Sequence, residues 1–149
     1  MAVREILIWP DKRLAQKCEP IEAVTDEIRT LAADMLETMY SADGVGLAAP
    51  HVGVFKRLVC IDLHGRDGHP SGEPPLVMIN PVFSDMEGQM TWEEGCLSVP
   101  QEHGVVTRYA KCTVDYMALD GTTACLVLLT HRDPAERIHV RLDRFVFVP

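Results

Sequence analysis

The chain has 149 residues, of which 47% are hydrophobic and 24% are charged, as expected for one soluble globular domain with a buried core. Its net charge of −8 at pH 7 disfavours nonspecific binding to nucleic acids, because a phosphate backbone requires a basic surface. No apolar run approaches the roughly 18–20 residues that cross a bilayer. The N-terminus also lacks the apolar region of a secretory signal, so we expect a cytoplasmic protein without a membrane partner.

The five cysteines are widely spaced and odd in number, and no CxxC pair occurs. In a chain of this size, that pattern argues against a disulfide framework and favours a reducing compartment. It also disfavours a four-cysteine structural zinc site.

The first expected element is a short apolar run, residues 6–9, which Pro10 and Asp11 close as a strand end or turn. The strongest periodic signal follows from about Thr25 to Tyr40, where apolar residues recur at steps of three and four and predict a helix. Thr25 is a suitable N-cap, and the acidic residues after it suit the positive end of the helix dipole.

The rest of the chain is rich in apolar or β-branched runs that predict strands. These runs are residues 57–63, 76–79, 81–83, 105–110, 112–118, 124–130 and 138–148. Glycines and prolines make residues 64–75 a surface loop, residues 80–81 mark a turn or bulge, and residues 120–121 mark a hairpin turn. No repeat or linker occurs, so we predict a single α+β domain over residues 1–149.

The segment 44–53 (GVGLAAPHVG) combines three glycines with small apolar residues. Glycine allows the backbone to adopt positive φ or to pass close to another group. Leu47 and the two alanines after it are suited to wall a narrow pocket. On glycine spacing alone, a tight helix-to-strand connection without chemistry remains the alternative.

The segment 93–100 (EEGCLSVP) places Cys96 directly after a glycine and before an apolar run. A thiolate metal ligand needs a backbone that brings its sulfur to the metal, and Gly95 allows such an approach. A lone cysteine is more often a small buried hydrophobe, and on spacing alone that alternative stays open. We expect residues 97–99 to form an extended strand.

Together the two segments resemble the first two signature motifs of the peptide deformylases, which are metallohydrolases that remove the formyl group from the N-terminal formylmethionine of nascent proteins. The resemblance covers about residues 3–121 and leaves residues 122–149 as a divergent tail. It implies an α+β fold in which antiparallel sheets pack around a helix. It also implies N-formylmethionyl peptides of nascent chains as partners, a location close to the ribosome, and Fe²⁺ or Zn²⁺ as cofactor.

The resemblance further implies roles for individual residues. Cys96 would be a metal ligand, and the backbone N–H of Leu97 would face the formyl oxygen of the substrate. The substrate-binding positions would be Gly44, Val45, Gly46, Leu47, Glu94 and Gly95. The family has glutamine after the proline of the first motif, where this chain has His51. An imidazole can also donate to an oxyanion, although with a different reach, and losing one such donor typically costs about 10²–10³ in turnover.

The third signature motif of the family, HExxH on a helix, supplies two histidine ligands and the general base. It does not occur in these 149 residues, and the tail instead contains His131, Glu136 and His139. On a helix the two histidines would be separated by roughly 12 Å, and Pro134 disfavours a continuous helix. We therefore expect the polar segment 131–137 to be a loop that is followed by an amphipathic strand.

The sequence thus favours a deformylase-like protein whose activity is weak or lost, and the alternative is a metal-free, catalytically inactive domain that binds peptides. An active enzyme would need a metal site rebuilt from Cys96, His131 and His139, with Glu136 as the base. A tail so unlike the family suggests a frameshifted or rearranged C-terminus. A generic α+β domain with coincidental motifs is disfavoured, because two independent matches occur in the right order.

Overall fold

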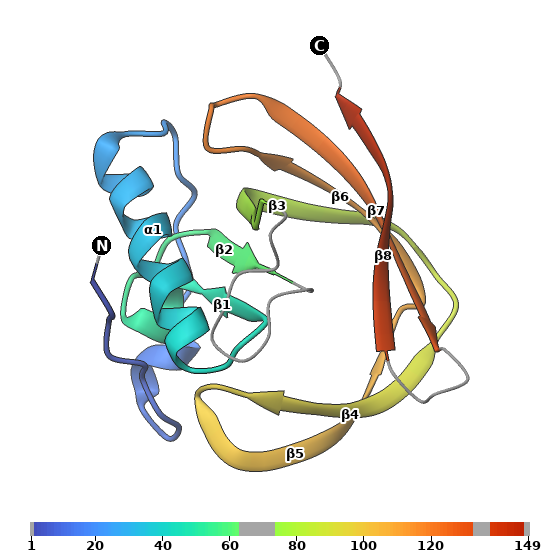
Figure 1. Cartoon of the computed structure of the whole chain (residues 1–149), viewed down its shortest axis with the longest axis horizontal. Coiled ribbons are helices and arrows are strands. Elements are labelled where there is room, and N and C mark those ends of the chain that lie inside the picture. Colours follow the sequence, from blue (N-terminus) through green and yellow to red (C-terminus); the bar gives the residue numbers. More distant parts are fainter. Residues whose placement is uncertain (1, 63–73, 133–137, 148–149) are drawn as a thin grey trace.

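The computed structural model describes residues 2–62, 74–132 and 138–147, with side chains described as far as residue 128 (Figure 1). The helices are the 3-10 turn η1 (Lys12–Ala15), α1 (Asp26–Ser41) and the 3-10 turn η2 (Ala49–Val52). The strands are β1 (Gly46–Ala48), β2 (Leu58–Ile61), β3 (Leu76–Glu87), β4 (Met90–Cys96), β5 (Val99–Arg108), β6 (Lys111–Met117), β7 (Thr123–Arg132) and β8 (Ile138–Phe147). None of the helices within the described residues is long and apolar enough to cross a membrane.

The helix predicted from the apolar period is confirmed as α1. Thr25 is its N-cap, and the Thr25 Oγ1 accepts a hydrogen bond from the Ile28 N–H at 3.4 Å. The apolar face of the helix is buried, with Met35 and Met39 fully enclosed. At the other end, the Gly44 N–H donates to the Met39 carbonyl at 2.9 Å, where the chain leaves the helix. Burial of this face against β1 and β2 is the physical cause of the period seen in the sequence.

Neighbouring strands are antiparallel throughout the two described sheets. Six strands form the larger sheet in the order β1-β2-β3-β6-β7-β8, and β4 pairs with β5 in a separate two-stranded sheet. Figure 1 shows α1 lying beside β1 and β2, whereas the β4–β5 hairpin curves away from the larger sheet. The predicted α+β architecture with antiparallel sheets around a helix is therefore confirmed.

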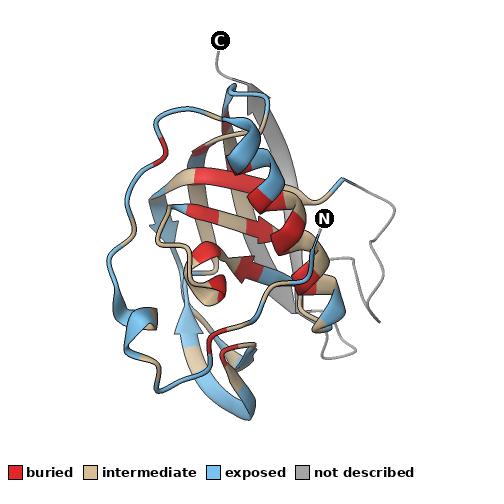
Figure 2. Ribbon diagram, turned by 90° about the vertical axis from the view of Figure 1, so that its left-hand side faces the viewer, coloured by how far each residue is buried: buried red, intermediate tan, exposed pale blue. Residues whose placement is uncertain are grey.

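The buried core lies on both faces of the larger sheet, because successive side chains of a strand point to opposite faces. Ile79 belongs to the cluster that packs against α1, and its neighbour Met78 belongs to a second cluster on the other face. The second cluster consists of Met78, Val114, Tyr116, Ala124 and Leu126. Figure 2 shows the buried residues along α1 and the strands beside it, whereas the β4–β5 hairpin is largely exposed.

Asn80 interrupts the regular pairing of β3 without ending the strand. Its φ is 52°, and the register with β6 shifts between Ile79 and Val82. The Asn80 side chain accepts a hydrogen bond from the Ile21 N–H at 2.9 Å and donates to the Ile21 carbonyl at 2.7 Å. The turn or bulge expected here is thus a bulge, and it fastens the segment before α1 to the sheet.

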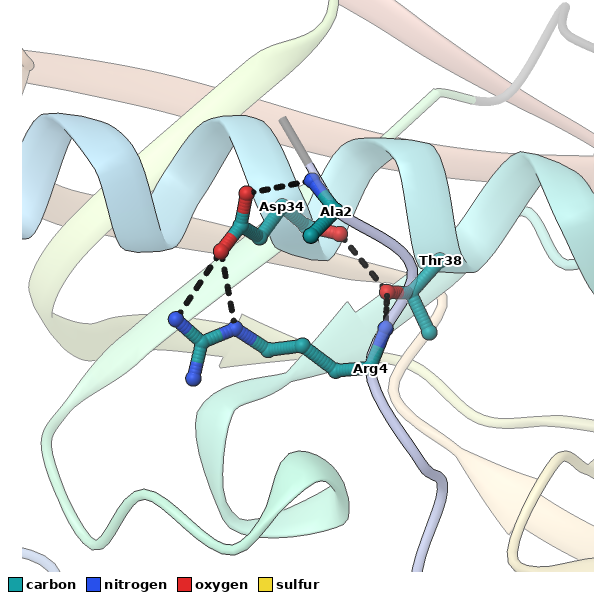
Figure 3. A network of polar contacts seen from close by, with 4 residues as sticks. All are labelled: Ala2, Arg4, Asp34 and Thr38. Atoms are coloured by element: carbon teal, nitrogen blue, oxygen red, sulfur yellow. Dashed lines mark hydrogen bonds and ion pairs between the residues drawn. The ribbon is translucent and has the colours of Figure 1, made fainter.

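Figure 3 shows how Asp34 of α1 holds the N-terminal segment. The Asp34 Oδ1 accepts from the Ala2 N–H at 2.8 Å, and its Oδ2 accepts from the Nε and Nη2 of Arg4 at 3.1 and 2.9 Å. The Arg4 N–H donates to the Thr38 Oγ1 at 2.9 Å, and this hydroxyl donates to the Asp34 carbonyl at 2.7 Å. The hydrogen bond from Ala2, followed by those from Arg4, lowers the pKa of Asp34.

Residues 6–9 belong to none of the described strands and end in a turn at Trp9 and Pro10, as one of the two expected outcomes. The Leu7 N–H donates to the His51 carbonyl at 2.7 Å, and the Trp9 N–H donates to the Ser98 carbonyl at 2.8 Å. The segment therefore bridges the two glycine-containing motifs through its backbone.

The tail forms a hairpin in which β7 pairs with β8, and Arg132 lies opposite Ile138. The prediction of a loop from residue 131 onward is therefore wrong for its first two residues. His131 and Arg132 belong to β7, because their pairing with β8 extends that strand beyond Thr130. Residues 133–137, where the rest of that loop was expected, and residues 63–73, which include most of the loop expected at 64–75, lie outside the described residues.

Candidate active site

A cleft of about 650 Å³ opens between the end of α1 and the β4–β5 hairpin. One wall consists of residues 42–46 and His51, and the other consists of residues 95–97 and 99–103. Ile6 also lines the cleft. The two glycine-containing motifs, which are far apart in the sequence, thus meet around one cavity.

At Gly44 the two walls lie close to each other. A Cβ placed at Gly44 would lie 2.7 Å from the Leu97 Cδ1 and 3.3 Å from the Met39 carbonyl oxygen. A larger residue at Gly44 would therefore require the Leu97 side chain to move. Leu47 has a different role from its neighbours, because it is 1% exposed and lies in the core rather than in the cleft lining.

The second motif forms the tip of the β4–β5 hairpin. Leu97 and Ser98 make the turn between the strands, so the extended strand expected over residues 97–99 is wrong except at Val99. The pairing register shifts after Gly95, and Cys96 becomes the partner of Val99. The tight turn follows from this closing pair, and it leaves Cys96 exposed at the cleft.

Glu94 lies outside the cleft lining and stabilises the hairpin instead. Its carboxylate accepts hydrogen bonds from the Arg108 Nε at 3.2 Å and Nη2 at 3.0 Å. This ion pair raises the pKa of the Arg108 guanidinium. Because Arg108 remains largely exposed, the pair holds β4 to β5 with only a small free energy.

His103 is a cleft residue that the sequence analysis did not single out. It is the β5 partner of Gly95, and a Cβ placed at Gly95 would lie 3.3 Å from the His103 Cδ2 and Nε2. The imidazole therefore covers the bare backbone of the second motif. This contact could have been predicted only if the pairing register of β4 with β5 had first been assigned from the sequence.

His51, which follows the proline of the first motif, is half-buried at the cleft. The Ala48 N–H donates to the His51 Nδ1 at 3.3 Å, so that nitrogen acts as an acceptor. Burial lowers the pKa of His51 and favours the neutral ring. In the tautomer that this hydrogen bond assigns, Nε2 carries the proton and is available as a donor.

The residues expected to hold a metal ion are described by the structure only in part. Among the residues whose side chains are described, no three His, Cys, Asp or Glu residues form a metal-binding group. The side chains of His131 and His139 lie outside those residues. His131 and His139 are Cα partners across β7 and β8, whereas a helix would hold them roughly 12 Å apart. Glu136 lies outside the described residues.

Comparison with known proteins identifies the fold and the family. The family model for polypeptide deformylase matches residues 3–130. The chain is 48% identical over 122 residues to a peptide deformylase of Afipia carboxidovorans, which covers 81% of this chain and 70% of the relative. It is 45% identical over 141 residues to a peptide deformylase of Bradyrhizobium diazoefficiens, which covers 93% of this chain and 77% of the relative.

The crystal structure of a peptide deformylase from Legionella pneumophila matches with a TM-score of 0.80 at 37% sequence identity, covering 91% of this chain and 75% of that structure. This likeness confirms the deformylase-like arrangement that the two motifs imply. The chain therefore belongs to the peptide deformylase family.

Proposed function

We propose that this protein binds N-formylmethionyl peptides in the cleft beside Cys96 and hydrolyses them far more slowly than family members that carry HExxH. The observation that carries the proposal is the cleft of about 650 Å³, which both glycine-containing motifs line. A cavity of this size lies within the usual range of small-ligand sites. Peptide deformylases are metalloenzymes that act on formylated nascent peptides, so the proposed ligand is that of the family.

Two donors at the cleft support recognition of the formyl group. The formyl oxygen would accept a hydrogen bond from the Leu97 N–H, which lies at the hairpin turn, and a second from the His51 Nε2–H. Both donors are held by local backbone geometry, so their orientation is established before the peptide binds. The neighbouring residues Gly44, Val45, Gly46 and Gly95 line the cleft in which the peptide backbone would lie.

Slow hydrolysis follows from the chemistry of the donor set. The family motif HExxH supplies two ligands and a base at fixed positions, and the 149 residues of this chain do not contain it. The family glutamine is replaced by His51 as well. Groups that act as a unit lose most of their joint effect when one of them is removed.

The test measures binding and chemistry separately. Isothermal titration with formyl-Met-Ala-Ser should detect binding, and unformylated Met-Ala-Ser should bind more weakly. His51→Gln should retain binding because glutamine keeps a hydrogen-bond donor. His51→Phe should weaken binding by about tenfold, which is the effect of losing one hydrogen bond to a formyl oxygen that water does not reach. Formate release should stay below about 1 s⁻¹, the lower end of ordinary turnover numbers.

Equal affinity for the formylated and unformylated peptides would contradict the proposed recognition. Turnover within the ordinary range of about 1–10³ s⁻¹, abolished by Cys96→Ala, would contradict slow hydrolysis.

The second candidate is an active hydrolase with a metal site rebuilt from Cys96, His131 and His139 and with Glu136 as the base. The register pairing of His131 with His139 favours it, because a site of three ligands needs them close together. Elemental analysis would then find about one Fe²⁺ or Zn²⁺ per chain. Cys96→Ala and His131→Ala would both lose the metal, and Glu136→Gln would keep the metal but lose turnover.

We place this function in the cytoplasm, close to the ribosome, where formylated N-termini emerge. The net charge of −8 argues against direct contact with ribosomal RNA, so any association would pass through the nascent peptide. Co-sedimentation with ribosomes that carry a formylated nascent chain, but not with empty ribosomes, would test this placement.

A further inference from the structure

A second hollow of about 360 Å³ lies on the β4–β5 hairpin and continues from the cleft. The two cavities share the residues Gly95, Cys96, Val99, Glu102 and His103. A peptide whose formyl group lies at Cys96 would therefore meet the second hollow within one or two residues, since an extended chain advances about 3.3 Å per residue.

His103 lines both the cleft and this hollow. Its Cδ2 and Nε2 would both lie 3.3 Å from a Cβ at Gly95, so the ring rests on the glycine backbone with no side chain beneath it. His103 and Gly95 are also strand partners, which places the backbone of His103 opposite the second motif. The ring is thus positioned to contact whatever passes from one cavity to the other.

The rest of the second hollow suits an apolar side chain. Val99 and Val106 contribute apolar surface, and at Gly104 no atom lies within 4 Å of the place a Cβ would occupy, so space is open there. At the far end, Glu94 and Arg108 form an ion pair at 3.0 Å and compensate each other's charge. Burial of a large apolar side chain against Val99 and Val106 would be favourable.

We propose that His103 is a specificity-determining residue that packs against a large apolar side chain downstream of the formylmethionine and seats it in the second hollow. This inference rests on the proposed binding of formyl peptides in the cleft. It assigns to His103 a role in choosing among such peptides, and none in hydrolysis.

Titration of three peptides tests the inference: formyl-Met-Gly-Gly, formyl-Met-Leu-Gly and formyl-Met-Gly-Leu. At one of the two downstream positions, leucine should improve the affinity of the unmodified protein by about three- to tenfold, the effect of burying part of a leucine side chain. His103→Ala should remove this advantage, and His103→Phe should keep it because a flat ring is retained. Val105→Ala is the matched control, because Val105 is an exposed β5 residue that lines neither cavity, and it should leave the advantage unchanged.

Two outcomes would overturn the assignment. In the first, leucine gives no advantage at either position in the unmodified protein; in the second, His103→Ala retains the full advantage. The affinity for formyl-Met-Gly-Gly shows whether only the role of His103 is contradicted or the proposed binding of formyl peptides as well. If that peptide binds normally to all variants, the cleft still recognises formyl peptides and only the role of His103 is wrong.

Discussion

The two walls of the cleft differ in how they are stabilised. The first wall belongs to the block of α1 and β1–β3, in which Met35, Leu47 and Cys60 are almost completely buried. The second wall belongs to the β4–β5 hairpin, where the pairing of two strands replaces a core and Val105 is 75% exposed. The comparison indicates that close packing holds one wall in place and that strand pairing holds the other. Substitutions in the two walls should therefore change the free energy of unfolding by very different amounts.

The largest effect is expected from the core of the first wall. Met35→Ala removes a fully buried side chain between α1 and the sheet and should lower the free energy of unfolding by about 2–5 kcal/mol. Val105→Ala on the hairpin should change it by less than about 0.5 kcal/mol. Urea unfolding followed by circular dichroism would measure both variants. Similar losses would contradict the contrast between the walls.

Gly44→Ala should have the next largest effect, because it acts where the walls touch. The added Cβ would lie 2.7 Å from the Leu97 Cδ1, so either Leu97 moves or the hairpin shifts outward, at a cost of about 1–3 kcal/mol. Gly104→Ala is the matched control, since its Cβ would meet no atom within 4 Å. The same unfolding assay should separate the two alanine variants. Equal stability would show that the walls are not in close contact.

A smaller and pH-dependent effect is expected at the N-terminal attachment to α1. The Ala2 N–H and then Arg4 lower the pKa of Asp34 below its ordinary value of 3.8, so the ionised carboxylate favours the folded state. This contribution is present above the unfolded pKa and is lost as the pH falls through the lower folded pKa. Asp34→Asn should therefore be less stable at pH 7, and its stability should fall less steeply below about pH 4.

Urea midpoints between pH 7 and pH 2.5 would measure this difference. Glu22→Gln, at an exposed residue outside the network, should keep the pH dependence of the unmodified protein. An identical acid response in Asp34→Asn would contradict the role of Asp34.

The smallest effect is expected from the surface ion pair of the hairpin. Glu94→Gln removes one partner of Arg108, and because the pair is partly exposed the loss should be about 0–1 kcal/mol. The difference from the unmodified protein should shrink further in 1 M salt, where the screening length is about 3 Å. A loss that does not change with salt would indicate that Glu94 packs against the hairpin rather than acting through its charge.

Elements held together by neighbouring residues were predictable from the sequence. The apolar period and the Thr25 cap located α1 to within one residue at each end, and residues 120–121 marked the turn between β6 and β7. The position of Gly44 and Cys96 in one site was predictable only through the family resemblance of their motifs. For the helix and the turn the information lies in a short segment, because helix caps and hairpin turns are local structures.

Contacts between distant segments were decided by the tertiary structure alone. The placement of His103 over Gly95 depends on the hairpin register, and the turn at Leu97 replaced an expected strand because Cys96 pairs with Val99. The proximity of His131 and His139 likewise depends on the pairing of β7 with β8, which no helical period could indicate. A one-residue change of register would move every side chain of a strand to the opposite face. The sequence by itself therefore determined α1, most of the strands, the family and the motif residues, and strand pairing determined which of those residues meet.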